Sequence, residues 1–124
     1  MKYREMAGEK ISVLGFGCMR FPTTSKNAED IDAEKSAKML EYAIENGVNY
    51  FDTAYVYHGG KSESFIGGVL KPYRDKIHIA TKCPTWEVKC EEDLDRLLNE
   101  QLERLQTDYI DFYLMHALDK DRFK

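Results

Sequence analysis

The chain has 124 residues, which suits a single domain over residues 1–124 and is too short for two independent cores. A hydrophobic fraction of 43%, an aromatic fraction of 12% and a charged fraction of 32% argue against disorder. The net charge of −4 and the lack of a long basic stretch exclude nucleic acid as the expected partner. No apolar run approaches the roughly 20 residues that span a bilayer, and the polar amino terminus lacks the apolar stretch of a signal peptide. We therefore expect no membrane association and a cytoplasmic location.

The cysteines and histidines indicate neither disulfides nor a metal site. Cys18, Cys83 and Cys90 form no CxxC pair and are odd in number, so reduced thiols are expected. The three histidines lack ligand spacing, and no second cysteine lies near enough to complete a zinc site.

The amino-terminal third predicts short strands and a loop. Residues 1–6 and 10–14 flank Gly8 and suit a hairpin closed at that glycine. Residues 14–17 (LGFG) predict a short strand, and residues 21–27, with a proline, two threonines and a serine, predict a loop.

Two helices and a strand follow. The first helix is expected from an N-cap at Asp32 to a stop at Gly47, with an apolar stripe at Ala33, Ala37, Leu40 and Ile44. Residues 48–52 (VNYFD) form the next strand. A second helix is expected over residues 62–70, ended by Pro72.

The carboxyl-terminal half repeats this alternation. Residues 77–82 predict a strand, and a loop containing Pro84 and Trp86 follows. A helix over 91–105 carries Leu94, Leu97, Leu98, Leu102 and Leu105 at helical spacing. Residues 109–116 (YIDFYLMH) form the last predicted strand.

Strands beginning near residues 48, 77 and 109 repeat with the length of one βα unit, which favours an α/β fold with a parallel sheet and helices outside it. Both an open doubly wound sheet and part of a (β/α)₈ TIM barrel fit this order. A dinucleotide-binding turn would place GxGxxG directly before a helix, whereas GFGCMR at 15–20 leads into a long loop.

Three ionisable residues end three different predicted strands: Asp52, Lys82 and His116. The carboxyl ends of parallel barrel strands open on one face, so these groups are expected to converge there. Tyr57 lies five residues past Asp52, in the loop on the same face.

Each of these residues also has a purely structural interpretation. Asp52 can cap a turn, Lys82 can be a solvated lysine or a simple ion-pair partner, and His116 can be a hydrogen-bonded core residue. Tyr57 is one tyrosine among eight. Four independent structural roles would seldom place all four residues on one face, and this favours a catalytic site.

Together these side chains suit proton donation to a developing alkoxide. A free tyrosine has a pKa of about 10, and a neighbouring lysine ammonium eases release of its proton. Lys82 would supply that charge to Tyr57, with Asp52 keeping Lys82 ionised. His116 would donate a hydrogen bond to a substrate carbonyl oxygen.

The phrases GFGCMR at 15–20, NYFDTAYVYHGGKSE at 49–63, IATK at 79–82 and LQTDYIDFYLMH at 105–116 resemble the amino-terminal half of an aldo-keto reductase. The resemblance implies a (β/α)₈ barrel with a hairpin over its base, and a catalytic tetrad of Asp52, Tyr57, Lys82 and His116. It also implies reduction of an aldehyde or ketone with NADP(H), or less often NAD(H).

The same resemblance places Cys18, Met19 and Arg20, together with Asp52, beside the nicotinamide. It implies that Trp86 lines the substrate pocket, with Tyr55 as a further aromatic of the pocket wall. The segments YHGGKSE at 57–63 and LMHALDKDRF at 114–123 also resemble a subgroup whose longer members carry a carboxyl-terminal iron-sulfur module, with ligands beyond Lys124.

The chain departs from the family pattern at one residue and in length. His58 stands where a glycine often follows the tetrad tyrosine. A complete barrel needs about 250 residues, so we expect the hairpin and the first four barrel strands, without the later loops that grip the cofactor. Open strand edges favour pairing into a homodimer; the alternative is that the sequence is a fragment of a longer product.

Two rival functions remain open. One is a non-catalytic interaction or regulatory module that retains the tetrad, because a fold and a motif do not guarantee turnover. The other is a thiol redox sensor using Cys18 and Cys83, both just past predicted strand ends.

Overall fold

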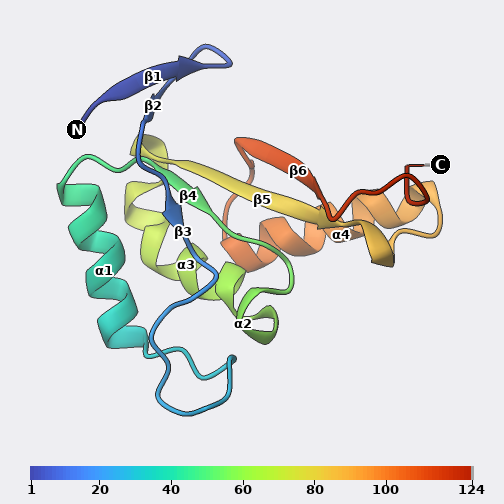
Figure 1. The fold of residues 1–124 in the computed structure, drawn as a ribbon, viewed down its shortest axis with the longest axis horizontal. Helices are drawn as coiled ribbons and strands as arrows, with labels where there is room; N and C mark the ends of the chain where they lie inside the picture. The colour runs from blue at the N-terminus through green and yellow to red at the C-terminus, as the bar shows by residue number, and fades with distance from the viewer. Residues whose placement is uncertain (124) are drawn as a thin grey trace.

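The computed structural model describes residues 1–123 as a parallel sheet with helices packed against it and a separate hairpin (Figure 1). The elements in chain order are β1 (Tyr3–Met6), β2 (Glu9–Ser12), β3 (Phe16–Gly17), α1 (Ala33–Glu45), β4 (Tyr50–Asp52), α2 (Tyr57–Gly60), α3 (Ser62–Leu70), η1 (Lys71–Lys76), β5 (His78–Pro84), η2 (Thr85–Glu87), α4 (Glu91–Leu105) and β6 (Phe112–His116). The sheet order β3-β4-β5-β6 follows the chain, as in successive βα units.

The hairpin β1-β2 closes through two residues with positive φ, Ala7 at 52° and Gly8 at 81°. Such backbone angles match the right-handed twist of the flanking strands. Asn49, directly before β4, accepts a hydrogen bond from the Ser12 amide at 2.8 Å. The hairpin is therefore attached at the amino end of the sheet, as predicted, and leaves the carboxyl ends of the strands free.

Helix α1 begins and ends as the sequence predicts. The Asp32 carboxylate accepts a hydrogen bond from the Lys35 amide at 3.2 Å, which satisfies one of the free N–H groups of the first turn. Gly47 follows the helix with φ of 90°, and a Cβ there would come within 2.8 Å of the Tyr3 hydroxyl. Glycine thus allows the helix to end against the hairpin.

The two faces of the sheet have different surroundings. Phe51 and Ile79 are fully buried on one face, in a core shared with Leu40 of α1, Ile66 of α3 and Leu105 of α4.

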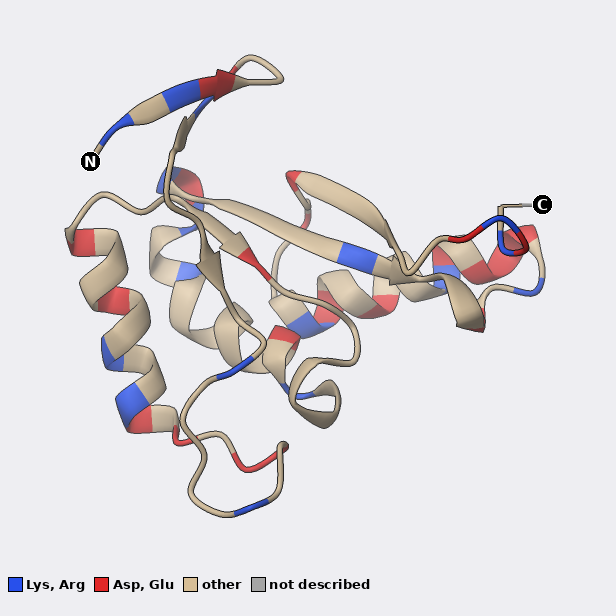
Figure 2. Cartoon of the chain, in the orientation of Figure 1, with Lys and Arg blue, Asp and Glu red and all other residues tan. Residues whose placement is uncertain are grey.

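The opposite face carries aromatic side chains and one charged pair. Tyr50 and Phe112 pack with ring centroids 5.6 Å apart, and Leu114 is 42% exposed. In Figure 2 most charged residues lie on the helices, the loops and the hairpin, and strands β3 to β6 carry one acidic and one basic residue, Asp52 and Lys82. This is the face that would line the interior of a closed barrel.

The predicted start of the last strand is wrong. The last strand begins at Phe112 rather than at 109, because Arg74 binds the preceding segment, donating to the Tyr109 carbonyl at 2.8 Å and the Asp111 carboxylate at 2.7 Å. Helix α3 ends at Leu70 as predicted, and a separate 3₁₀ turn, with Pro72 near its start, continues the chain to Lys76. Proline is tolerated in the first turn of a helix because the N–H it lacks has no partner there.

Among residues 1–123, no helix is both long enough and apolar enough to cross a bilayer.

Candidate active site

Lys82 is the centre of a cluster at the carboxyl end of the sheet. Its ammonium donates to both carboxylate oxygens of Asp52 at 2.9 Å, to the Thr53 carbonyl at 2.6 Å and to the Tyr57 hydroxyl at 3.2 Å. The Lys82 side chain is 14% exposed. An ammonium has three protons to donate, so these contacts fix its position against the phenol.

Strand register brings Asp52 and Lys82 together. Asp52 ends β4 and pairs with Ala80 of β5, and side chains two residues apart on a strand share a face. Lys82 is not at the end of its strand as predicted, because β5 continues to Pro84, which pairs with His116. The two extra residues bring His116 beyond Lys82 on the neighbouring strand.

Tyr57 and His116 complete the cluster from two further elements. Tyr57 begins the single turn α2, and its ring lies edge-on to the His116 ring with centroids 6.0 Å apart. Trp86, in η2, lies 5.2 Å from His116 between ring centroids and is 38% exposed. The predicted pocket residue therefore contacts a predicted catalytic residue.

His116 occupies an environment that favours its neutral form. Burial, and then the nearby Lys82 ammonium, lower the pKa of His116, while the Asp52 carboxylate acts in the opposite direction. Its Nδ1 atom is buried and has no hydrogen-bond partner among the described residues. A neutral imidazole carries one N–H and can donate one hydrogen bond to an uncharged acceptor.

The three residues predicted to lie beside a nicotinamide have different surroundings. The Cys18 amide donates to the Asp52 carbonyl at 2.8 Å, which attaches this segment to the cluster. The Cys18 side chain is fully buried in the core, whereas Met19 is 40% exposed and Arg20 is exposed. The Cys18 side chain is therefore not accessible to a ligand, and only its backbone remains available.

Tyr55 packs against α4 rather than toward the cluster. Its ring stacks under the Arg104 guanidinium at 4.1 Å, and its hydroxyl donates to the Glu100 carboxylate at 3.0 Å. The suggestion that Tyr55 lines a substrate pocket therefore finds no support in its contacts.

Hydrogen bonds of Glu63 and Arg104 hold the loop that carries Tyr55 against β5 and α4. Glu63, fully buried, accepts hydrogen bonds from Thr81 at 2.8 Å and Gln101 at 2.9 Å. Arg104 donates to Glu63 at 3.3 Å and to the Tyr55 carbonyl at 3.0 Å. Burial raises the pKa of Glu63, and these hydrogen bonds and the guanidinium oppose that shift.

Sequence reasoning missed one contributor to the site and noted a second, His58, only as a departure from the family pattern. The Thr53 carbonyl holds Lys82 through the backbone, which no residue identity reveals. His58 has φ of 55°, a left-handed conformation that costs about 1 to 2 kcal/mol for a residue other than glycine. The signal was present in the sequence, since a histidine directly before two glycines interrupts a turn that glycine favours.

The buried thiols give no support to a redox sensor. Cys18 and Cys83 are both fully buried, and burial raises the pKa of the Cys18 thiol, with the Asp52 carboxylate adding to the effect. A reactive thiol needs exposure and a lowered pKa.

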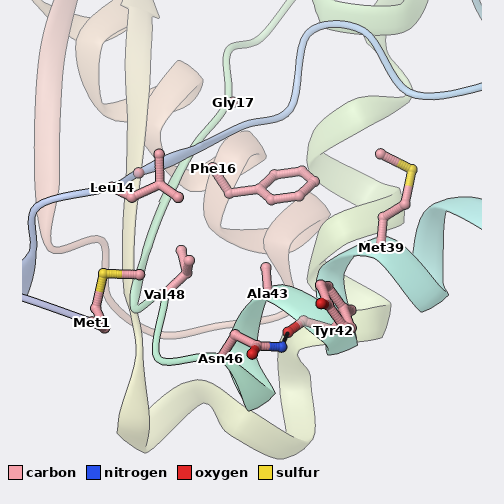
Figure 3. Close-up of a pocket in the computed structure, with 10 residues that line it drawn as sticks. Met1, Leu14, Phe16, Gly17, Met39, Tyr42, Ala43, Asn46 and Val48 are labelled. Carbon is pink, nitrogen blue, oxygen red and sulfur yellow. Dashed lines mark hydrogen bonds between the residues drawn. The ribbon is translucent and has the colours of Figure 1, made fainter.

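An apolar pocket of about 440 Å³ lies between β3 and α1, with Leu14, Phe16, Met39, Tyr42 and Val48 in its wall (Figure 3). None of the four clustered residues lines it. It marks the free edge of β3 rather than the site. Within residues 1–123, no group of three or more histidine, cysteine or acidic residues is placed to hold a metal ion.

Comparison with known proteins gives a consistent result. The model of the Aldo/keto reductase family matches residues 13–122. The "Uncharacterized oxidoreductase YqkF" of Bacillus subtilis (strain 168) is 34% identical over 116 residues, covering 86% of this chain and 35% of the relative.

Among solved structures, the holo form of the aldo-keto reductase AKR11C1 from Bacillus halodurans is 36% identical, with a TM-score of 0.76 over 92% of this chain and 40% of that one. An aldo-keto reductase from Klebsiella pneumoniae in complex with NADPH is 26% identical, with a TM-score of 0.74 over 90% of this chain and 37% of that one. The chain spans about a third of the length of the curated relatives it matches.

Proposed function

Because the chain belongs to the aldo/keto reductase family, we propose that it carries the proton-donating half of an oxidoreductase site that reduces an aldehyde or ketone to an alcohol. Its four sheet strands correspond to the first part of a (β/α)₈ barrel, as the structural relatives indicate. Asp52, Tyr57, Lys82 and His116 are the proposed catalytic residues.

Tyr57 is the proposed general acid. The Lys82 ammonium, 3.2 Å from the phenolic oxygen, stabilises negative charge there as the proton leaves for the substrate oxygen. Asp52 binds the same ammonium through both carboxylate oxygens and keeps it charged and oriented. This shared hydrogen-bonded centre at Lys82 is the observation that carries the proposal.

His116 is proposed to orient the carbonyl group. A neutral imidazole beside the Tyr57 ring donates its N–H to the substrate oxygen without competing for the proton that Tyr57 delivers. Trp86 then forms the adjacent apolar wall for the substrate.

The hydride is expected from a nicotinamide cofactor, which supplies two electrons and a hydrogen to the carbonyl carbon. The proposed protein contacts are Met19 and Arg20, the backbone of Cys18, and Asp52. NADPH in the Klebsiella pneumoniae structure favours NADP(H) over NAD(H). A cytoplasmic location remains the prediction for an enzyme of this kind.

Replacement of Tyr57 by phenylalanine tests the proposal. Consumption of NADPH with an aromatic aldehyde is followed for the purified chain, for Tyr57→Phe and for Tyr42→Phe, a control whose ring is 68% exposed on α1. We expect the first substitution to lower turnover by about 10²- to 10⁴-fold, with unchanged affinity for NADPH. Equal turnover in all three proteins would remove Tyr57 from the mechanism, and an inactive wild-type chain would support the non-catalytic module.

A further inference from the structure

His58 links two segments that are distant in the sequence. Its Nε2 atom accepts a hydrogen bond from the Phe21 amide at 2.9 Å, and its Nδ1 atom lies 2.7 Å from the Ala28 carbonyl oxygen. A carbonyl oxygen only accepts, so Nδ1 carries the proton and Nε2 offers a lone pair. The neutral imidazole satisfies both contacts, and the side chain is 7% exposed.

The backbone at this position is bent sharply just after Tyr57. His58, Gly59 and Gly60 have φ values of 55°, 60° and 89°, three consecutive left-handed residues. Glycine adopts this conformation without strain, so a histidine is retained here against the local backbone preference. Its two side-chain hydrogen bonds offset that strain.

Packing strengthens the link on both sides. The rings of Phe21 and His58 lie 5.6 Å apart between centroids. A Cβ at Gly59 would come within 3.3 Å of the Glu29 side chain, so the loop lies directly against the turn. The Asp32 amide donates to the Pro22 carbonyl at 2.7 Å and closes the loop between them.

The linked segments carry the two halves of the proposed chemistry. Phe21 directly follows Met19 and Arg20, the proposed cofactor contacts, and His58 directly follows Tyr57, the proposed acid. The hydrogen bond from Phe21 to His58 therefore sets how far the cofactor segment lies from the phenol.

We infer that His58 is a positioning residue that clamps the segment after β3 to the turn carrying Tyr57, and so fixes the proton donor relative to the cofactor. This inference rests on the proposed function for its catalytic consequence. Its structural part, the clamp itself, is tested without any turnover.

The first test uses NMR on the full chain with labelled tyrosine and histidine. In the wild type we expect a protonated Nδ1 on His58 and contacts between the rings of Tyr57 and His116. His58→Gly keeps the left-handed backbone accessible and removes the clamp, so those ring contacts are expected to disappear. The matched control is Ser25→Ala, which removes the hydrogen bond from the Ser25 hydroxyl to Asp30 at 2.6 Å and the one it accepts from the Asn27 amide at 3.0 Å, and leaves both His58 partners unchanged.

The second test is kinetic. We expect His58→Gly to lower kcat for carbonyl reduction by about 10- to 100-fold, with little change in the KM for the carbonyl, and added imidazole to restore part of the loss. Ser25→Ala is expected to retain the wild-type kcat. If His58→Gly fails to fold, His58→Asn, which tolerates a left-handed backbone, is measured in its place.

The outcomes separate the two claims. Unchanged Tyr57–His116 ring contacts in the His58 variant would overturn the clamp, and a wild-type kcat in that variant would overturn its catalytic consequence. Equal turnover of the wild type and Tyr57→Phe would overturn the proposed function, while the NMR spectra of the labelled tyrosines would still decide whether His58 positions Tyr57.

Discussion

The hydroxyl of Tyr57 lies next to the Lys82 ammonium, which is hydrogen-bonded to three different residues. Lys82 binds Asp52, the Thr53 carbonyl and the Tyr57 hydroxyl, so its side chain has little freedom to leave the phenol. Removal of either Lys82 or Asp52 leaves the charge of the other in a partly desolvated position, where an unpaired charge destabilises the fold.

Lys82→Met tests this arrangement at the residue scale. The methionine keeps the apolar stem and removes the ammonium, so we expect carbonyl reduction to fall by at least about 10²-fold while NADPH binding persists. Lys38→Met is the control, because Lys38 is 71% exposed on α1 and pairs with Glu34 at the surface. Steady-state rates decide, and comparable rates in the two variants would contradict the role of Lys82.

The pKa of His116 predicts a pH dependence of folding. Because burial lowers the pKa of His116 in the folded chain below its ordinary value of 6.5, the unfolded chain binds more protons as the pH falls below that value. Stability is therefore lost on acidification. Urea unfolding between about pH 8 and pH 5 is compared with that of His116→Gln, which lacks this titration. The stability advantage of the wild type is expected to shrink toward acidic pH, and a constant difference would contradict the assignment.

At the scale of elements, close packing of α3 on α4 depends on one glycine of an adjacent pair. A Cβ at Gly67 would lie 2.6 Å from the backbone carbon of Leu105 and 2.7 Å from the Arg104 carbonyl oxygen, whereas a Cβ at Gly68 meets only the flexible end of Gln106 at 3.6 Å. Backbone at such a distance cannot move aside without separating the helices.

The changes in the free energy of unfolding caused by alanine at Gly67 and at Gly68 should therefore have opposite signs. Gly67→Ala is expected to destabilise the chain by at least about 2 kcal/mol, and Gly68→Ala to stabilise it by up to about 1 kcal/mol through helix propensity. Denaturant unfolding of both variants measures the difference. Similar stabilities for the pair would contradict the tight helix contact.

The apolar periodicity of the sequence predicts which helices and strands form, and it predicts the ends of the strands less well. The heptad-like leucines of α4 and the cap at Asp32 are local signals, so helices α1, α3 and α4 lie where expected. The ends of β5 and β6 depend on pairing across the sheet and on Arg74, which is remote in sequence.

In the candidate site, too, some features could be predicted from the sequence and others depend on the tertiary structure. Strand-end positions and the resemblance select the four clustered residues from the sequence. The contribution of the Thr53 carbonyl depends on backbone geometry, which residue identities do not encode, whereas the glycines after His58 do indicate a turn there. The burial of Cys18 and the outward packing of Tyr55 likewise follow from tertiary contacts.

At the scale of the whole molecule, the sheet has two free edges and an open face. Strands β3 and β6 each pair on one side only, and the apolar pocket with Leu14 and Tyr42 lies beside the edge of β3 (Figure 3). Unpaired edges bind other strands. Two copies arranged about a two-fold axis, each β6 beside the partner's β3, would supply eight parallel strands.

We therefore propose that the 124-residue chain alone forms a homodimer through these edges. Light scattering is expected to give twice the 14.4 kDa mass of one chain. Leu14→Asp, at a side chain that is 60% exposed and so is not needed for the fold of one copy, is expected to shift the mass toward that of a monomer. A monodisperse wild-type monomer would sink the proposal.

The central claim, that this chain carries the proton-donating half of a reductase site with nicotinamide contacts beside it, is tested most directly by titrating the purified chain with NADPH and following Trp86 fluorescence. Trp86 is the single tryptophan and lies beside His116, so its emission reports on the site alone. The account predicts saturable quenching with a Kd in the micromolar range. A folded chain whose Trp86 emission shows no saturable response to NADPH would contradict it.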